Sequence, residues 1–100
     1  AQPELVDGMQ PALLRVLHAV VEAGRREGIR IMLCGELASQ TSMSTPLLGL
    51  GFDALSVDPR RIPAVRRALR GKSVARARTL IAQALECSTL AEVRALYAEG

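Results

Sequence analysis

The sequence predicts an α/β fold in which two short parallel strands are joined through a helix and accompanied by about five helices. Three observations lead to this prediction. Apolar side chains recur at three- and four-residue spacing in several segments, as in helices that bury one face. Only residues 29–33 and 52–57 have the short apolar character of strands. The chain has two aromatic residues, so aliphatic side chains must fill its core, which is typical of helical and α/β layers.

The first helix is predicted over residues 11–27, because Pro11 suits the first helical position and Gly28 suits the stop. Its apolar stripe consists of Leu13, Leu14, Leu17, Val20, Val21 and Gly24. Its polar face consists of Arg15, His18, Glu22, Arg25 and Arg26. His18, the only histidine, is therefore expected to be a solvated surface residue.

Both strands are predicted in the middle of the chain. Residues 29–33, "IRIML", are nearly all apolar, which indicates cover on both faces of the strand, as in a parallel sheet. Residues 34–44 are small and polar and predict a loop. A short helix over 45–50 then leads to the second strand, 52–57. Two strands connected through a helix form a parallel, right-handed βαβ unit.

Three further helices complete the predicted order. One opens at Asp58–Pro59 and continues to about Arg70, where Gly71 breaks it. Ser73 caps the second, whose inward side chains are Val74, Ala77, Leu80, Ile81, Ala84 and Leu85. Thr89 and Glu92 have the spacing of a capping box and start the last helix. Its inward side chains are Leu90, Val93, Leu96 and Tyr97.

Two parallel strands do not make a stable sheet by themselves. Residues 1–100 are therefore expected to form one partial domain, a C-terminal fragment of a TIM (β/α)₈ barrel. It would carry the last two βα units of the barrel and the helices that close the outer ring. Copies of such a fragment could associate through their strand edges.

Basic residues gather in one part of the chain, which has a net charge of +3. No acidic residue lies between Asp58 and Glu86, where eight basic residues occur. No aromatic residue interleaves them and no nucleic-acid motif is present, so a solvated helix face is favoured and no nucleic-acid partner is expected. The alternative is a positive rim beside the barrel mouth that steers an anionic substrate.

The chain is expected to be cytoplasmic and to make no membrane contact. It has no apolar run of the roughly 20 residues that a membrane span needs, and no signal-peptide pattern. Its two cysteines, Cys34 and Cys87, do not make a disulfide framework. Cys87 is expected to pack in the core.

Cys34 is the candidate for chemistry, because it follows the first strand and barrel active sites lie at the C-terminal ends of strands. No second cysteine or histidine stands at metal-ligand spacing, which disfavours a metal site. The predicted position of His18 disfavours a cysteine–histidine nucleophile. The role of Cys34 as a proton donor remains open, since thiols mostly carry their proton near neutral pH. From position alone, a buried, inert cysteine is the favoured interpretation.

Four segments resemble the C-terminal end of enzyme I of the bacterial sugar phosphotransferase system, a phosphoenolpyruvate (PEP)–protein phosphotransferase. They are "MLCGELAS", "PLLGLGFDALSV", "RRIPAVRRALR" and "ARTLIAQALECSTLAEVRAL". The resemblance implies a cytoplasmic, dimeric enzyme whose barrel binds PEP with Mg²⁺. It passes the phosphoryl group to a histidine on another domain, which serves a phosphocarrier protein in sugar transport, and it releases pyruvate.

The resemblance also assigns roles within this chain. The family's proton donor to the pyruvate enolate corresponds to Cys34, and Gly35 and Glu36 match the substrate loop. Gly35 is expected to contribute only through its backbone, and Glu36 is expected to order the loop. The Mg²⁺ ligands, most of the phosphate-clamping arginines and the accepting histidine belong to earlier parts of the family's sequence. The chain alone is therefore expected to be inactive.

Two segments depart from the family pattern. Ser39 and Gln40 stand where a glycine and an acid are common, and "SVDP", residues 56–59, stands where serine and alanine are more usual. These departures leave a nitrogen-regulatory paralogue open and, less readily, a PEP synthase or pyruvate phosphate dikinase relative. A non-catalytic regulatory or interaction module that uses the basic helices is the competing alternative.

Overall fold

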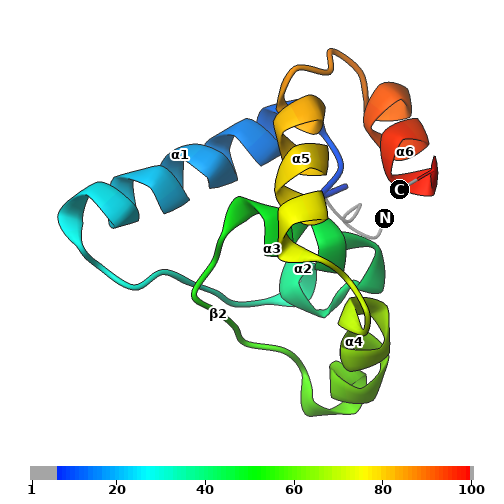
Figure 1. The fold of residues 1–100 in the computed structure, drawn as a ribbon. Coiled ribbons are helices and arrows are strands. Elements are labelled where there is room, and N and C mark those ends of the chain that lie inside the picture. Colours follow the sequence, from blue (N-terminus) through cyan, green and yellow to red (C-terminus); the bar gives the residue numbers. More distant parts are fainter. Residues whose placement is uncertain (1–6, 100) are drawn as a thin grey trace, which may run out of the picture.

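A computed structural model describes residues 7–99, and helices dominate them (Figure 1). The helices are α1 (Pro11–Glu27), α2 (Glu36–Ser39), α3 (Ser44–Leu50), α4 (Ile62–Leu69), α5 (Val74–Leu85) and α6 (Leu90–Glu99). Short 3₁₀ turns, η1 (Thr41–Met43) and η2 (Pro59–Arg61), precede α3 and α4. The strands β1 (Met32–Leu33) and β2 (Ala54–Leu55) pair in parallel. The predicted α/β class and parallel βαβ unit are thus confirmed, whereas the barrel remains a prediction.

The core lies where α3 packs against α5. Leu47 and Leu50 of α3 and Ile81 and Ala84 of α5 are buried there, and Leu14 of α1 joins them. Figure 1 shows α5 standing beside α3, with α1 and α6 at its two sides. Aliphatic side chains fill this core, as the lack of aromatic residues predicts. The described helices contain none long and apolar enough to cross a membrane.

The predicted helix ends are confirmed at several positions. Gly28 ends α1 in a left-handed conformation with φ of 67°, and its backbone N–H donates to the carbonyl of Arg25. Ser73 Oγ accepts from the backbone N of Arg76 at 3.2 Å. The capping box forms in both directions: Thr89 Oγ1 accepts from Glu92 N at 3.1 Å, and Glu92 Oε1 accepts from Thr89 N at 3.0 Å.

The strands are shorter and more exposed than the sequence predicts. Ile29 and Met32 have 60% and 58% of their surface exposed. The prediction that both faces of the first strand are buried is therefore wrong for the described residues. The reason is alternation along the strand. Leu33 and Leu55 pack against the helical core, so the side chain of Met32 must point to the other face, which the described helices leave open.

Residues 34–44 are not the predicted loop, because α2 and η1 form there. These turns bury Ala38 and Met43, two apolar residues within the polar run. The helix predicted from Asp58 to Arg70 is divided into η2 and α4.

Single side chains also differ from their predicted places. Val20 and Val74 are each 47% exposed rather than inward. Val20 lies beside the buried line of Leu14 and Val21 and so at the edge of the apolar stripe, and Val74 is the first residue of α5. His18 is half-buried rather than fully solvated.

Arg15 ties α1 to the end of α5. Its Nε donates to the carbonyl of Leu85 at 3.1 Å, and its Nη2 donates to the carbonyl of Cys87 at 2.6 Å. These carbonyls have lost their helical partners at the C-terminus of α5, where a cation is favoured. The polar face predicted for α1 therefore includes one arginine that stabilises a helix end.

Tyr97 should show its burial in an alkaline titration. Its hydroxyl is buried without a hydrogen-bond partner among the described residues. Burial raises the pKa of the phenol above its ordinary value, and the negative charge of Cys87 adds to the rise. The free energy of unfolding is expected to stay constant up to about pH 10 and then to fall. The reason is that the phenol of Tyr97 ionises at a lower pH in the unfolded chain than in the folded chain.

Tyr97→Phe should remove this alkaline loss and leave stability at neutral pH unchanged or higher, since no hydrogen bond is lost. Tyr97 is the only tyrosine and the chain lacks tryptophan, so phenolate absorbance reports on this residue alone. A folded chain whose phenol titrates at the ordinary value would contradict the prediction.

Candidate functional site

The C-terminal ends of β1 and β2 bring two distant segments of the chain together. The backbone N of Ser56 donates to the carbonyl of Leu33 at 2.8 Å, so the residues that follow each strand begin side by side. Cys34 follows Leu33 directly, and its side chain is exposed. This exposure excludes the buried, inert cysteine that position alone favours. The role of Cys34 as a proton donor stays a prediction. Cys87 is half-buried and packs against the core.

Gly35 makes the sharp turn after Cys34. Its φ of 94° and ψ of −169° lie in a region that is essentially confined to glycine. A Cβ placed there would meet no atom within 4 Å, so the backbone conformation, rather than crowding, requires glycine. Glu36 starts α2 immediately after the turn and is exposed. The turn thus fixes the direction in which the chain leaves Cys34.

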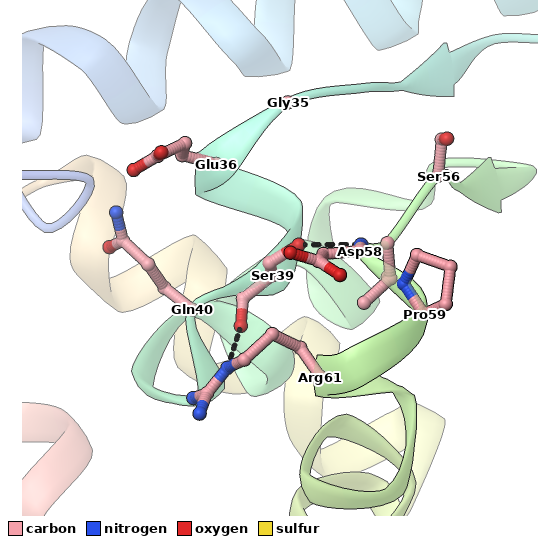
Figure 2. A pocket seen from close by; sticks show the side chains of 9 residues that line it. Gly35, Glu36, Ser39, Gln40, Ser56, Asp58, Pro59 and Arg61 are labelled. Carbon is pink, nitrogen blue, oxygen red and sulfur yellow. Dashed lines mark hydrogen bonds between the residues drawn. The ribbon is translucent and has the colours of Figure 1, made fainter.

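A cleft of about 580 Å³ opens between the segments that follow the two strands (Figure 2). One wall consists of Gly35, Glu36, Ser39 and Gln40, and the other consists of Ser56, Val57, Asp58, Pro59 and Arg61. Cys34 directly precedes the first of these lining residues. The predicted site residues therefore adjoin or line one cleft, at the end of the sheet where ligands of α/β folds bind.

Ser39 joins the two walls of the cleft. Its Oγ accepts a hydrogen bond from the backbone N of Asp58 at 3.0 Å, across 19 positions of sequence, in a half-buried place. The carbonyl of Ser39 accepts a longer bond from Arg61 Nε at 3.5 Å. Both bonds are drawn in Figure 2. They hold the turn that carries Gly35 and Glu36 at a fixed distance from the turn after β2.

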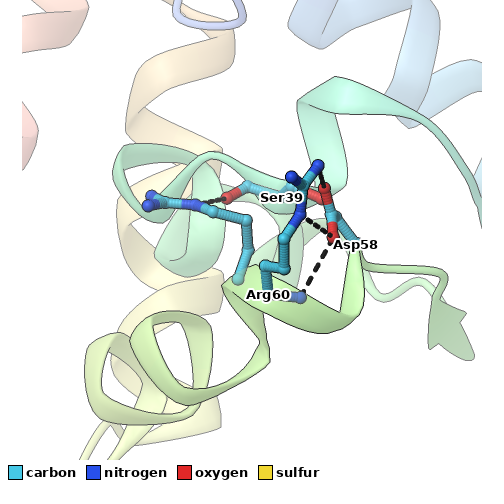
Figure 3. Close-up of polar contacts among 4 residues, drawn as sticks. Ser39, Asp58 and Arg60 are labelled. Atoms are coloured by element: carbon cyan, nitrogen blue, oxygen red, sulfur yellow. Dashed lines mark hydrogen bonds and ion pairs between the residues drawn. The ribbon is translucent and has the colours of Figure 1, made fainter.

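Asp58 is an N-cap that also neutralises a neighbouring arginine. Its carboxylate accepts from the backbone N of Arg60 at 3.0 Å and from Arg60 Nη2 at 3.0 Å (Figure 3). These hydrogen bonds hold the pKa of the Asp58 carboxyl below its ordinary value, and they raise the pKa of Arg60. Asp58 therefore stays ionised at neutral pH, with its charge directed to Arg60.

Removing the Ser39 hydroxyl should loosen this connection. Ser39→Ala leaves the half-buried N–H of Asp58 without its acceptor, which costs about 1 kcal/mol of unfolding free energy. Urea unfolding should show a lower midpoint with an unchanged slope, and the Asp58 amide hydrogen should exchange faster. Ser39→Thr keeps a hydroxyl and is the matched control. Unchanged exchange at Asp58 in Ser39→Ala would contradict the assigned bond.

Sequence reasoning found Cys34, Gly35 and Glu36 but assigned no role to Ser39 and Arg61. Ser39 and Asp58 were noticed only as departures from the family pattern. The signal that could have linked them is that both departures follow a predicted strand, so the parallel sheet brings them to the same end.

Two other features of the described residues bear on chemistry. No three His, Cys, Asp or Glu side chains gather among residues 7–99 to hold a metal ion. The basic run is exposed, as predicted for a solvated helix face. Its exposed members beyond the cleft are Arg60, Arg66, Arg67, Arg70, Lys72, Arg76 and Arg78.

Known proteins match most of the chain. Residues 2–74 match the family model described as PEP-utilising enzyme, PEP-binding domain. The chain is 38% identical over 100 residues to a multiphosphoryl transfer protein of Xanthomonas campestris pv. campestris, covering 97% of this chain and 12% of the relative. It is 39% identical over 92 residues to a multiphosphoryl transfer protein of Escherichia coli O6:H1, covering 92% of this chain and 11% of the relative.

A PEP-protein phosphotransferase of Haloferax volcanii is 39% identical over 90 residues, which cover 90% of this chain and 16% of the relative. The chain thus spans only a small part of the length of the relatives that it matches.

Proposed function

The chain belongs to the PEP-utilising enzymes, and on that premise we propose that it is part of a PEP–protein phosphotransferase in which Cys34 protonates the enolate of pyruvate. One observation carries the proposal. An exposed thiol follows β1 at the end of the sheet and adjoins a cleft of about 580 Å³. An acid must be reachable by its substrate, and the exposure of Cys34 meets that condition.

The proton transfer can be written with its atoms balanced. Loss of the phosphoryl group from PEP leaves the enolate of pyruvate. The C3 carbon of the enolate takes the proton from the Cys34 Sγ–H, so a C–H bond forms and the S–H bond breaks. Pyruvate and a thiolate result. Because Cys34 is exposed, the thiolate can regain a proton from water, which restores the acid for the next turnover.

Gly35 and Glu36 contribute through the backbone and the loop. The left-handed turn at Gly35 sets the direction of the chain after Cys34, and α2 begins at Glu36. Ser39, at the end of α2, holds this segment to the turn after β2. We infer that these residues position Cys34 and do not exchange protons with the substrate.

The rest of the reaction is proposed for a longer protein of which this chain is one part. The names of the relatives, which refer to multiphosphoryl transfer and PEP-protein phosphotransfer, support transfer of a phosphoryl group from PEP to a protein. We propose a histidine acceptor on another domain, a phosphocarrier partner and a sugar or nitrogen branch of the system. A (β/α)₈ barrel would cover the open face of β1, and a homodimer and cytoplasmic location complete the proposal. Mg²⁺ would bind residues outside 7–99, and no step assigned to this chain passes through it.

Exchange of pyruvate methyl protons tests the proposal, because it is the reverse of the proposed proton transfer. A full-length protein that carries this chain should exchange the methyl protons of pyruvate with D₂O, as followed by NMR. Cys34→Ala should slow the exchange by about 10²- to 10⁴-fold and Cys87→Ala should retain it. Exchange at the wild-type rate in Cys34→Ala would overturn the assigned acid. The 100-residue chain with PEP and Mg²⁺ is expected to form no pyruvate, and its formation would contradict the proposal that other segments are needed.

A further inference from the structure

Cys34 and Ser56 are neighbours across the two strands. Leu33 pairs with Leu55 in the parallel register, so the next pair in the same register is Cys34 and Ser56. The backbone N of Ser56 donates to the carbonyl of Leu33 at 2.8 Å, which continues the ladder to this pair. Because neighbouring strands lie about 4.8 Å apart, the two side chains of such a pair can reach hydrogen-bond distance by rotation about their Cα–Cβ bonds.

Alternation along the strands places both side chains on the same face of the sheet. Leu33 and Leu55 pack against the helical core. Cys34 and Ser56 follow them directly and so point to the opposite face, on which Met32 is exposed. Both are themselves exposed, and no side-chain hydrogen bond within residues 7–99 engages the Cys34 thiol or the Ser56 hydroxyl. A free thiol and a free hydroxyl therefore lie next to each other at the end of the sheet.

The other side-chain donors that line the cleft are directed elsewhere. Arg61 Nε donates to the carbonyl of Ser39 at 3.5 Å, and the Ser39 hydroxyl accepts from the backbone at the end of α2. Figure 2 draws the Arg61 guanidinium and the Gln40 amide on the side of the cleft away from Ser56. The Ser56 side chain lies at the end of β2 and is directed toward β1 (Figure 2). Ser56 is thus the donor of the cleft that the fold places beside the thiol.

We propose that the Ser56 hydroxyl donates a hydrogen bond to the Cys34 sulfur as that sulfur gives its proton to the enolate of pyruvate. The inference rests on the proposed function for the role of Cys34. The sulfur becomes negatively charged in this step, and a hydrogen bond to an ion is stronger than one to a neutral group. The bond therefore stabilises the developing thiolate more than the resting thiol, which speeds the proton transfer. Ser56 keeps its own proton throughout, and the thiolate regains a proton from water.

Exchange of pyruvate methyl protons with D₂O measures the effect in a full-length protein that carries this chain. Ser56→Ala should slow the exchange by about tenfold, because a hydrogen bond to a charged acceptor is lost. Ser56→Thr keeps a hydroxyl and should restore most of the rate. Ser42→Ala is the matched control, since Ser42 is exposed and lies outside the cleft, and it should exchange as wild type does. Exchange at the wild-type rate in Ser56→Ala would overturn the inference.

Alkylation of Cys34 by iodoacetamide separates this bond from a merely structural effect. The thiolate is the form that reacts, and mass spectrometry of the peptide that contains Cys34 follows this one thiol in the full-length protein. At pH 7, Ser56→Ala should react about threefold more slowly than wild type, because less thiolate forms without the donor. At about pH 9.5, where the thiolate predominates in both proteins, Ser56→Ala should react at least as fast.

The two measurements keep the inference apart from the proposed function. The same ratio of alkylation rates at both pH values would overturn the bond from Ser56, even where Cys34→Ala slows methyl-proton exchange as expected. Exchange at the wild-type rate in Cys34→Ala would instead overturn the proposed acid, whatever the alkylation rates.

Discussion

Replacing Cys34 with alanine in a full-length protein that carries this chain is expected to lower the steady-state rate of pyruvate formation by about 10²- to 10⁴-fold. The reason is that alanine has no proton to give to the enolate carbon, so protonation must wait for water. The exposed position of Cys34 lets water reach the site, which keeps the residual rate measurable. Pyruvate formation is followed with excess PEP and a phosphoryl acceptor.

Cys87→Ala is the control for thiol loss, because Cys87 packs against the core and lies outside the cleft. It should retain nearly the full rate, provided that the protein stays folded. Cys34→Ser separates the two roles of the side chain, since a hydroxyl has nearly the same size but is a much weaker acid. It should be almost as slow as Cys34→Ala. A serine variant with the wild-type rate would argue that shape, and not acidity, matters at this position.

Gly49→Ala is expected to destabilise the fold by about 3 kcal/mol or more. A Cβ at Gly49 would lie 2.3 Å from the carbonyl oxygen of Ala77 and 2.8 Å from its carbon. Both are backbone atoms of α5, so no side-chain rotation can relieve the contact and α3 must move away from α5. On an exposed helix the same change would instead stabilise by about 1 kcal/mol. Urea unfolding monitored by circular dichroism measures the effect.

Gly24→Ala provides a matched comparison inside another helix. Its Cβ would meet Ile31 Cγ1 at 2.4 Å, but Ile31 is a partly exposed side chain that can change rotamer. The loss should therefore be clearly smaller than for Gly49→Ala. Equal losses for the two variants would show that close approach of α3 and α5 is not the special feature of Gly49.

The helices could be predicted because their signals are local. Gly28, Ser73 and the Thr89–Glu92 capping box act within a few residues, and the structure forms each of them. The strands were harder to predict, because other layers of the fold decide whether a face of a strand is buried. "IRIML" has the composition of a strand buried on both faces, yet Met32 is exposed in the described residues. The turn α2 escaped prediction because Ala38, which it buries, is one small residue within a polar run.

The candidate site was predictable where it depended on strand position. Cys34 and Gly35 follow β1 directly, so the βαβ unit fixes their place at the end of the sheet. Ser39 could not be assigned in this way, because its partner Asp58 is 19 positions away and only the folded chain brings them together. The different environments of Arg60 and Arg61 were equally hidden, since adjacent arginines look alike in a sequence.

Rapid-quench measurement of a single turnover in the Cys34→Ala protein tests the central claim most directly. Phosphoryl transfer from labelled PEP and release of pyruvate are measured in the same samples. If Cys34 is the acid, the phosphoryl group should reach its acceptor at close to the wild-type rate, and pyruvate should appear much later. Equal slowing of both steps would contradict the role of Cys34 as the proton donor.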